Sequence, residues 1–316
     1  MAMTNGISHA RPGRIAAALG AGVAAVLLYP SDSSPSWQGP AAVDRRETAP
    51  VFRTTVNRVT LFATVRDSRG RLVPNLSAAD FELVDEGTPL QIVDFRSDGV
   101  PVSLALLLDV SGSMAVGGKL ARAKMAGKQL VERLEPGSDE GALFAFDTEL
   151  RELQVFATAL EKLPSSLEGA QAFGATSLWD AIAAAAREVA ERGSQRRALV
   201  VLTDGIDTRS RWRAEDVSGL ASSIDVPVYI IATTSPVRAD RMKHLTDLAR
   251  WTGGDLFPVT TPATGAAAAD RIIEELRQQY FIAFDASATP GWHPLVVRVR
   301  DRRVHARARS GYFVER

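Results

Sequence analysis

Short apolar runs alternate with longer segments of helical periodicity across the middle of the chain. The expected strands are apolar along most of their length, as in a sheet buried on both faces: 104–108, 141–146, 198–202, 226–232 and 256–259. Apolar residues at helical spacing predict helices between them, at 120–134, 178–192, 214–224, 242–249 and 272–276. A further run, 153–156, is expected to pair antiparallel at the sheet edge. This order predicts an α/β fold with a doubly wound, mostly parallel sheet.

Both flanks of this region show the two-residue alternation of half-buried antiparallel strands. Before it, alternating or apolar runs occur at 59–65, 81–84 and 90–95; after it they occur at 281–284, 297–299 and 304–308. Neither flank is long enough to bury a sizeable core alone. We therefore expect one small antiparallel β-sandwich, formed by the N- and C-terminal flanks together, with the α/β domain inserted between them.

The first 50 residues differ in composition from the rest. Arg11 and Arg14 precede an apolar run, 15–29, of signal-peptide length, shorter than the ~20 apolar residues of a membrane span. An alanine-rich buried helix is the alternative. The predicted segments are a signal peptide or N-terminal anchor at 1–30, a linker at 31–50, a β-module at 51–100, the α/β domain at 101–278 and the second half of the β-module at 279–316.

Composition narrows the classes of function. Lys plus Arg is 37 and Asp plus Glu is 37, so no bulk charge favours nucleic acid or an anionic membrane. Membrane contact is expected only through a retained leader. The absence of cysteine excludes disulfides and thiolate chemistry. None of the four histidines lies near a candidate serine nucleophile in the sequence, and no Gly-x-Ser-x-Gly elbow or phosphate loop is present, so the chain is not expected to be an enzyme.

The candidate chemistry begins where the first apolar strand ends. Asp109, Ser111 and Ser113 form an all-oxygen cluster just before a helix, and open α/β sheets bind ligands outside the carboxyl ends of their strands. Hard cations such as Mg²⁺ prefer such oxygen ligands. Asp109 as a turn residue, with the two serines as loop residues, is the alternative.

This Asp-x-Ser-x-Ser stretch resembles the metal-ion-dependent adhesion site of von Willebrand factor type A domains. In that family a second loop supplies a threonine, matched here by Thr176, and a third supplies an aspartate, matched by Asp204. The resemblance implies a doubly wound sheet and a bound Mg²⁺, Mn²⁺ or Ca²⁺ on Asp109, Ser111, Ser113, Thr176 and Asp204. It also implies that a protein partner offers an Asp or Glu carboxylate to the cation, so that the activity is binding.

Other readings of these loops remain open. Thr176 or Ser177 could cap the helix that follows, and Asp204 with its glycine could be a simple turn. Asp147 and Asp207 are weaker metal candidates, expected to be loop carboxylates in water. Trp212, between two arginines, is a candidate for the partner surface.

The chain from about residue 50 onward is also similar to a bacterial group described as acidobacterial-type von Willebrand A-related proteins. Asp80-Phe81, the turn at 85–87 and the closing stretch 309–313 carry that similarity with the site loops. The expected function is that of an exported, metal-dependent protein-binding module, periplasmic, extracellular or anchored to the cell envelope. The alternative is a structural or assembly subunit that binds through its β-sandwich, with a vestigial metal site.

Overall fold

The computed structural model describes residues 58–97, 100–192, 196–213, 224, 226–234 and 239–314. The predicted leader and linker lie outside these residues, as does the helix expected at 214–224 apart from Ile224. The described parts belong to one compact unit, Thr54–Arg316. No helix within the described ranges is both long and apolar enough to cross a membrane.

A six-stranded sheet forms the centre of the α/β domain, in the order β10-β9-β8-β5-β6-β7. Neighbouring strands pair parallel except at the edge, where β7 runs antiparallel to β6, which confirms the expected hairpin there. The strands are β5 Val102–Asp109, β6 Glu140–Phe146, β7 Leu150–Ala157, β8 Arg196–Thr203, β9 Val228–Ala232 and β10 Leu256–Pro258.

Strand β5 occupies the middle of this sheet and every one of its residues is buried. Because the chain passes from β5 to β6 on one side and later returns to β8 on the other, the strand order reverses at β5. Such a switch point leaves a crevice beside the carboxyl ends of the strands. The end of β5, at Asp109, therefore lies where a ligand can be bound.

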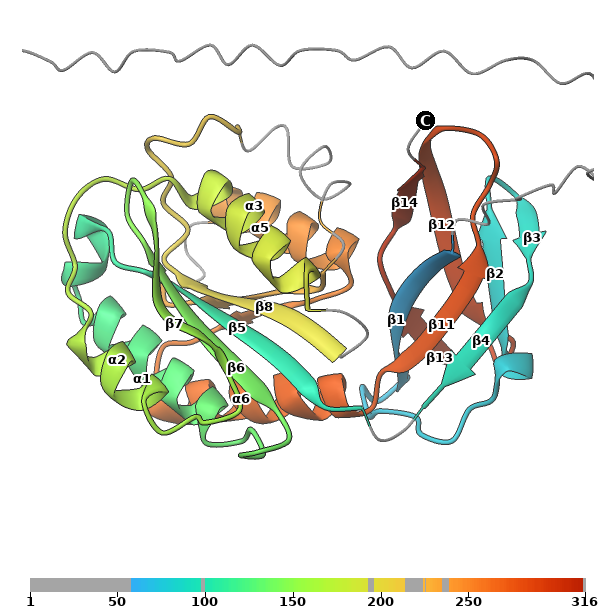
Figure 1. The fold of residues 1–316 in the computed structure, drawn as a ribbon, viewed down its shortest axis with the longest axis horizontal. Helices are drawn as coiled ribbons and strands as arrows, with labels where there is room; N and C mark the ends of the chain where they lie inside the picture. Colours follow the sequence, from blue (N-terminus) through green and yellow to red (C-terminus); the bar gives the residue numbers. More distant parts are fainter. Residues whose placement is uncertain are drawn as a thin grey trace, which may run out of the picture. The chain divides into compact units, whose positions relative to one another are not determined.

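Helices cover both faces of the sheet, as a doubly wound fold requires (Figure 1). Helices α1, α2 and α6 pack on one face and α3 and α5 on the other, each face with its own apolar core. Their bounds are α1 Lys119–Val131, α2 Leu163–Gly169, α3 Leu178–Ala190, α5 Ala239–Thr252 and α6 Pro262–Arg277. Helix α2 was not predicted, because seven residues with only Leu163 and Leu167 buried give too little periodicity.

Strands from the two flanks pair in two four-stranded antiparallel sheets. They alternate in the sheet β13-β1-β11-β4 and meet once, at β12 and β2, in the sheet β14-β12-β2-β3. The first flank supplies β1 Arg58–Asp67, β2 Phe81–Asp85, β3 Thr88–Leu90 and β4 Ile92–Arg96. The second supplies β11 Tyr280–Asp285, β12 Gly291–Val299, β13 Val304–Arg307 and β14 Gly311–Val314. One apolar core joins side chains from both flanks. The predicted fold class, a doubly wound sheet inserted in an antiparallel sandwich, is confirmed.

A buried carboxylate on α6 connects the sandwich to the α/β domain. Glu275 is fully buried and forms ion pairs with Arg66 of β1, at 2.5 Å, and with Arg307 of β13. Arg307 also contacts Asp255, just before β10, at 3.1 Å. Removing one member of such a network leaves a buried charge uncompensated, which typically costs about 3–5 kcal/mol. The two domains are therefore held together by charge as well as by the chain.

A second polar cluster lies within the sandwich. Asp85 accepts a 2.7 Å hydrogen bond from the Tyr312 hydroxyl and lies 3.3 Å from Nδ1 of His293. The Nε2 atom of His293 lies 2.8 Å from the carbonyl oxygen of Thr289. The Thr289 carbonyl and the Asp85 carboxylate favour the protonated ring, and together they raise the pKa of His293 above 6.5 against the opposing effect of burial.

This raised pKa predicts a specific pH dependence of stability. A group whose pKa is higher in the folded state stabilises the fold fully below its unfolded pKa and loses that contribution as pH rises through the folded value. We expect the free energy of unfolding to be higher for wild type than for His293→Gln. This difference should be largest at about pH 5.5 and should shrink toward about pH 8.5. Urea unfolding across this range measures it.

The matched control is His305→Gln, at an exposed histidine on β13 of the same sandwich. Tyr312 does not titrate in this window, since burial raises its pKa to about 12. A difference between wild type and His293→Gln that stays constant with pH would contradict the assignment.

Candidate metal centre

The predicted site residues lie on loops at the carboxyl edge of the central sheet. Asp109 is the last residue of β5, and Ser111 and Ser113 follow in the turn that contains the short 3-10 helix Gly112–Ala115. Asp204 directly follows β8, the neighbour of β5. Two strand ends that are adjacent in the sheet thus present one carboxylate each.

Asp109 is fully buried and held by neighbouring donors. Its Oδ1 accepts a 2.9 Å hydrogen bond from the backbone N–H of Ser111, and its Oδ2 accepts a 2.6 Å bond from the Thr203 hydroxyl. Burial raises the pKa of Asp109 to about 6 despite these hydrogen bonds, and the charge of Asp204 acts in the same direction. A cation close to Asp109 would favour its ionised form.

The two serines present hydroxyls beside this carboxylate. The Oγ atoms of Ser111 and Ser113 lie 3.2 Å apart, and Ser111 is fully buried whereas Ser113 is half-buried. Hydroxyl groups add oxygen ligands without adding negative charge. The turn after β5 therefore combines one anionic group with two neutral oxygen donors.

Asp204 is paired with a lysine that the sequence did not single out. Its side chain is 1% exposed, and its Oδ2 accepts a 2.7 Å ion-paired hydrogen bond from Nζ of Lys119. The same Nζ donates at 3.2 Å to the carbonyl oxygen of Ser113. Asp204 and the serine turn are consequently neighbours, bridged by one ammonium group.

The loop that contains Thr176 and precedes α3 contacts the turn after β5. The N–H of Gly112 donates to the carbonyl of Gly174 at 2.9 Å, and the N–H of Phe173 donates to the carbonyl of Val110 at 2.7 Å. A Cβ atom at Gly112 would lie 3.1 Å from that Gly174 oxygen, so a side chain there would push the loops apart. Thr176 itself is 2% exposed.

The loop after β8 caps helix α3, a role that the sequence offered to Thr176 or Ser177. Ser177 occupies the N-cap position but its side chain makes no capping bond; Asp207 Oδ1 instead accepts from the N–H of Leu178 at 2.8 Å. Asp147 is 8% exposed and accepts from Arg151 at 2.9 Å. Asp207 thus accepts from an N–H group at the start of α3, and Asp147 pairs with the guanidinium of Arg151, so both carboxylates have structural partners. The expectation that they are loop carboxylates in water was wrong.

Sequence reasoning missed two residues that contact the site. Thr203 donates to Asp109 and also accepts from the N–H of Gly205 at 3.0 Å, so it fixes the carboxylate and the turn after β8 together. Its place at the polar end of an apolar strand, immediately before Asp204, was the available signal. Lys119 gave none, because only the fold brings the start of α1 to the end of β8.

The donor set agrees with the chemistry of a hard divalent cation. The described residues contain no group of three or more His, Cys, Asp or Glu side chains placed to hold a metal. The candidate site has two carboxylates, with hydroxyls as the remaining oxygens, and all-oxygen sets suit Mg²⁺ and Ca²⁺. Asp109, a buried acid with a raised pKa, is the residue whose environment best fits the binding of a cation.

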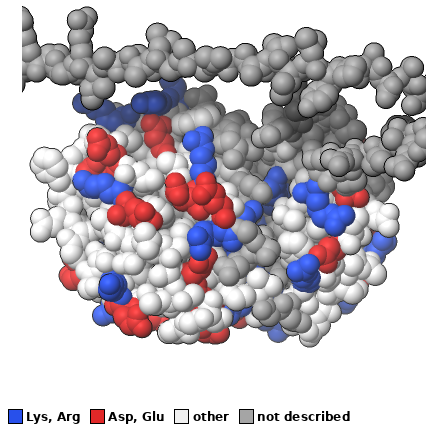
Figure 2. All heavy atoms as spheres, in the orientation of Figure 1, with Lys and Arg blue, Asp and Glu red and all other residues white. Residues whose placement is uncertain are grey.

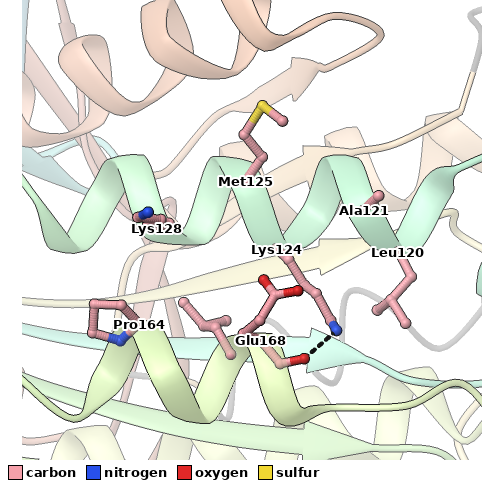
Figure 3. A pocket seen from close by; sticks show the side chains of 8 residues that line it. Leu120, Ala121, Lys124, Met125, Lys128, Pro164 and Glu168 are labelled. Atoms are coloured by element: carbon pink, nitrogen blue, oxygen red, sulfur yellow. Dashed lines mark hydrogen bonds between the residues drawn. The ribbon is translucent and has the colours of Figure 1, made fainter.

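A separate groove of about 530 Å³ lies between α1 and α2. Leu120 and Lys124 point from α1 toward α2, and Pro164 and Glu168 face them (Figure 3). Lys124 closes part of the groove by donating at 2.6 Å to the carbonyl oxygen of Glu168. The residues lining this groove do not include any of the predicted metal ligands, so it is distinct from the site.

Comparison with known proteins agrees with the geometry at the level of the domain. The family model described as von Willebrand factor type A domain matches residues 104–206, which contain all five predicted metal ligands. No curated protein matches the chain.

Several solved structures resemble parts of the chain. An aerotolerance-related membrane protein from Bacteroides fragilis is 19% identical, covers 55% of this chain and 98% of its own, and gives a TM-score of 0.47. A von Willebrand factor type A protein from Catenulispora acidiphila is 13% identical, with 84% and 76% covered and a TM-score of 0.47. The D319A mutant of the PilB minor pilin from Streptococcus sanguinis is 15% identical, with 57% and 62% covered and a TM-score of 0.45. At these scores the likenesses carry no functional conclusion. The segment that builds the site, residues 104–206, is thus the part of the chain that is similar to von Willebrand factor type A domains.

Proposed function

We propose that this protein is exported and binds another protein through a divalent cation held at the carboxyl edge of its central sheet. Asp109, Ser111, Ser113, Thr176 and Asp204 would hold the cation, which we take to be Mg²⁺, with Mn²⁺ or Ca²⁺ as substitutes. The observation that carries the proposal is the fully buried Asp109, whose pKa is raised to about 6, next to Asp204 and two serine hydroxyls.

The residues of the chain act here by positioning and by charge. A bound divalent cation would supply a positive centre able to attract a carboxylate from the partner. Thr203 and the N–H of Ser111 orient Asp109 by hydrogen bonds. Because the serine and threonine hydroxyls are neutral, the site would not fully neutralise a bound divalent cation. The described histidines, His244, His293 and His305, lie on α5, β12 and β13, none of which contributes a predicted ligand, and this favours binding over turnover.

The rim of the site supports a partner that is both acidic and apolar. Phe173 and Val116, on the two loops joined at Gly112, are 81% and 67% exposed. Arg209 and Arg211 are exposed on the loop after β8, and Figure 2 shows Lys and Arg atoms gathered over this loop. Trp212, which the sequence suggested for this surface, is half-buried and packs against the apolar core that includes α3. An Asp or Glu flanked by apolar residues would complement this rim.

Export rests on the leader sequence, which lies outside the described residues. Arg11 and Arg14 followed by the apolar run 15–29 are typical of a secretory signal or a retained anchor. We place the protein in the periplasm, outside the cell or on the cell envelope.

Asp109 is the residue whose substitution tests the metal site. We expect titration of the wild type with Mg²⁺ or Mn²⁺ in a calorimeter to show one site, and Asp109→Asn to lose it, because a neutral amide replaces a ligand charge. The matched control is Asp301→Asn, which removes a carboxylate from an exposed ion pair with Arg303 on the sandwich. Equal affinity in Asp109→Asn and wild type would refute the site.

Thr203 should act on the site through Asp109. Thr203→Val keeps the shape but removes the donor to Asp109 and the acceptor for Gly205, so we expect about 1–3 kcal/mol lower stability and weaker Mn²⁺ binding. Thr203→Ser, which keeps the hydroxyl, is expected to restore most of both in the same melts and titrations. Wild-type behaviour in Thr203→Val would remove Thr203 from the positioning role.

The rim makes a prediction about partner chemistry. Random peptides displayed on phage and selected on the protein with Mg²⁺ should become rich in Asp or Glu next to aromatic or aliphatic residues. A chelator, Phe173→Ala or the pair Arg209→Glu and Arg211→Glu should reduce their recovery. Val155→Ala, at an equally apolar residue that is 57% exposed on β7, should not. Enrichment indifferent to chelator would count against the proposal.

One observation favours the alternative of an assembly subunit that binds through its sandwich. A groove of about 520 Å³ lies at one end of the sandwich, lined among others by Glu86, Asp285 and Trp292. Trp292 is 40% exposed there. Binding through this groove would survive chelator and be lost in Trp292→Ala, which separates it from the metal-dependent mode.

A further inference from the structure

Lys119 occupies an unfavourable position for a cation unless a specific anion holds it. It is the first residue of α1, where the helix dipole is positive and repels a positive side chain. The side chain is nevertheless only 22% exposed. Folding an ammonium group into this place requires a compensating negative charge, and the carboxylate of Asp204 provides it at 2.7 Å.

The contacts of Lys119 coincide with the candidate metal centre. Its Nζ donates to Oδ2 of Asp204 and, at 3.2 Å, to the carbonyl oxygen of Ser113. Both acceptors belong to residues proposed as metal ligands. The carboxylate of Asp204 is 1% exposed, so its charge is balanced locally by this lysine. Asp109 accepts from Ser111 and Thr203 and has no such ion pair among the contacts described above.

We propose that Lys119 is a tethered counter-ion that neutralises Asp204 while the protein is free of metal, and that a divalent cation must displace it. This inference rests on the proposed metal site and adds a residue that sets its affinity. Loading the site would exchange one positive charge for two, and two cations sharing Asp204 would repel each other strongly at such distances. The affinity of the site is therefore lowered by the work of moving Lys119.

The substitution Lys119→Met tests this exchange, since it keeps a long side chain without the charge. We expect Mn²⁺ and Mg²⁺ to bind roughly tenfold more tightly to Lys119→Met than to wild type in calorimetric titration. Lys119→Arg, which keeps the charge, should stay close to wild type. The matched control is Lys128→Met, at an exposed lysine on the same helix, which changes net charge equally but should leave affinity unchanged.

A second measurement needs no substitution. An amine-acylating reagent followed by mass spectrometry reports how accessible each lysine of the wild-type protein is. Lys119 should react slowly in metal-free protein and several-fold faster once Mg²⁺ saturates the site, whereas the rate at Lys128 should not change. Lys119→Met leaves the buried carboxylate of Asp204 without its ion pair and can therefore fail to fold. The acylation measurement on wild type does not depend on that variant.

The outcomes separate the inference from the function on which it rests. If Asp109→Asn abolishes metal binding while Lys119→Met binds no more tightly than wild type, the counter-ion role is overturned and the metal site stands. If wild type, Lys119→Met and Lys119→Arg all fail to bind Mn²⁺ and Mg²⁺, both are overturned. An acylation rate at Lys119 that does not respond to Mg²⁺, in protein shown to bind it, also overturns the counter-ion role.

Discussion

The burial of β5 on both faces is the constraint from which the site follows. With β6 and β8 paired along its sides and helices above and below, the strand has no route to water along its length. Ser103, its one polar residue before the end, is satisfied by Glu140 at 2.6 Å. A polar side chain that can also bind a ligand is therefore expected only where β5 leaves the sheet. Asp109 stands at that point, still buried but beside loops that can deliver other oxygens.

The charge balance around Asp109 and Asp204 explains the character of this edge. Two buried acids that are close enough to influence each other raise the cost of ionisation, and a single lysine pairs with one of them. Hydrogen bonds from Thr203 and Ser111 support the other without neutralising it. Under the proposed function, a bound divalent cation would supply further positive charge to these two acids and favour the ionised form of Asp109.

Sequence patterns predicted the fold better than the contacts of the site. Apolar runs and two-residue alternation are repeated signals, so the strands and the interleaved flanks could be predicted from them, whereas α2, with seven residues, could not. Asp109, Ser111 and Ser113 lie within five residues and could be grouped from the sequence, whereas Thr176 and Asp204 were assigned to the site through the family resemblance. In the structure β5 and β8 are neighbours, so Asp109 and Asp204 lie at the same edge of the sheet. The capping role of Asp207 and the ion pair of Lys119 depend on how loops pack, and periodicity does not encode that packing.

The interleaving of the two flanks has a consequence for how the chain reaches its native state. Strand β1 pairs with β11, so Val59 lies opposite Phe284, and more than 200 residues separate partners that are hydrogen-bonded neighbours. During synthesis the first flank emerges long before its partner strands exist, with sheet edges open to wrong pairing. The intervening α/β domain can close its own core first and bring the two ends near each other. We therefore expect the sandwich to fold after the α/β domain, because contacts of such long range form slowly.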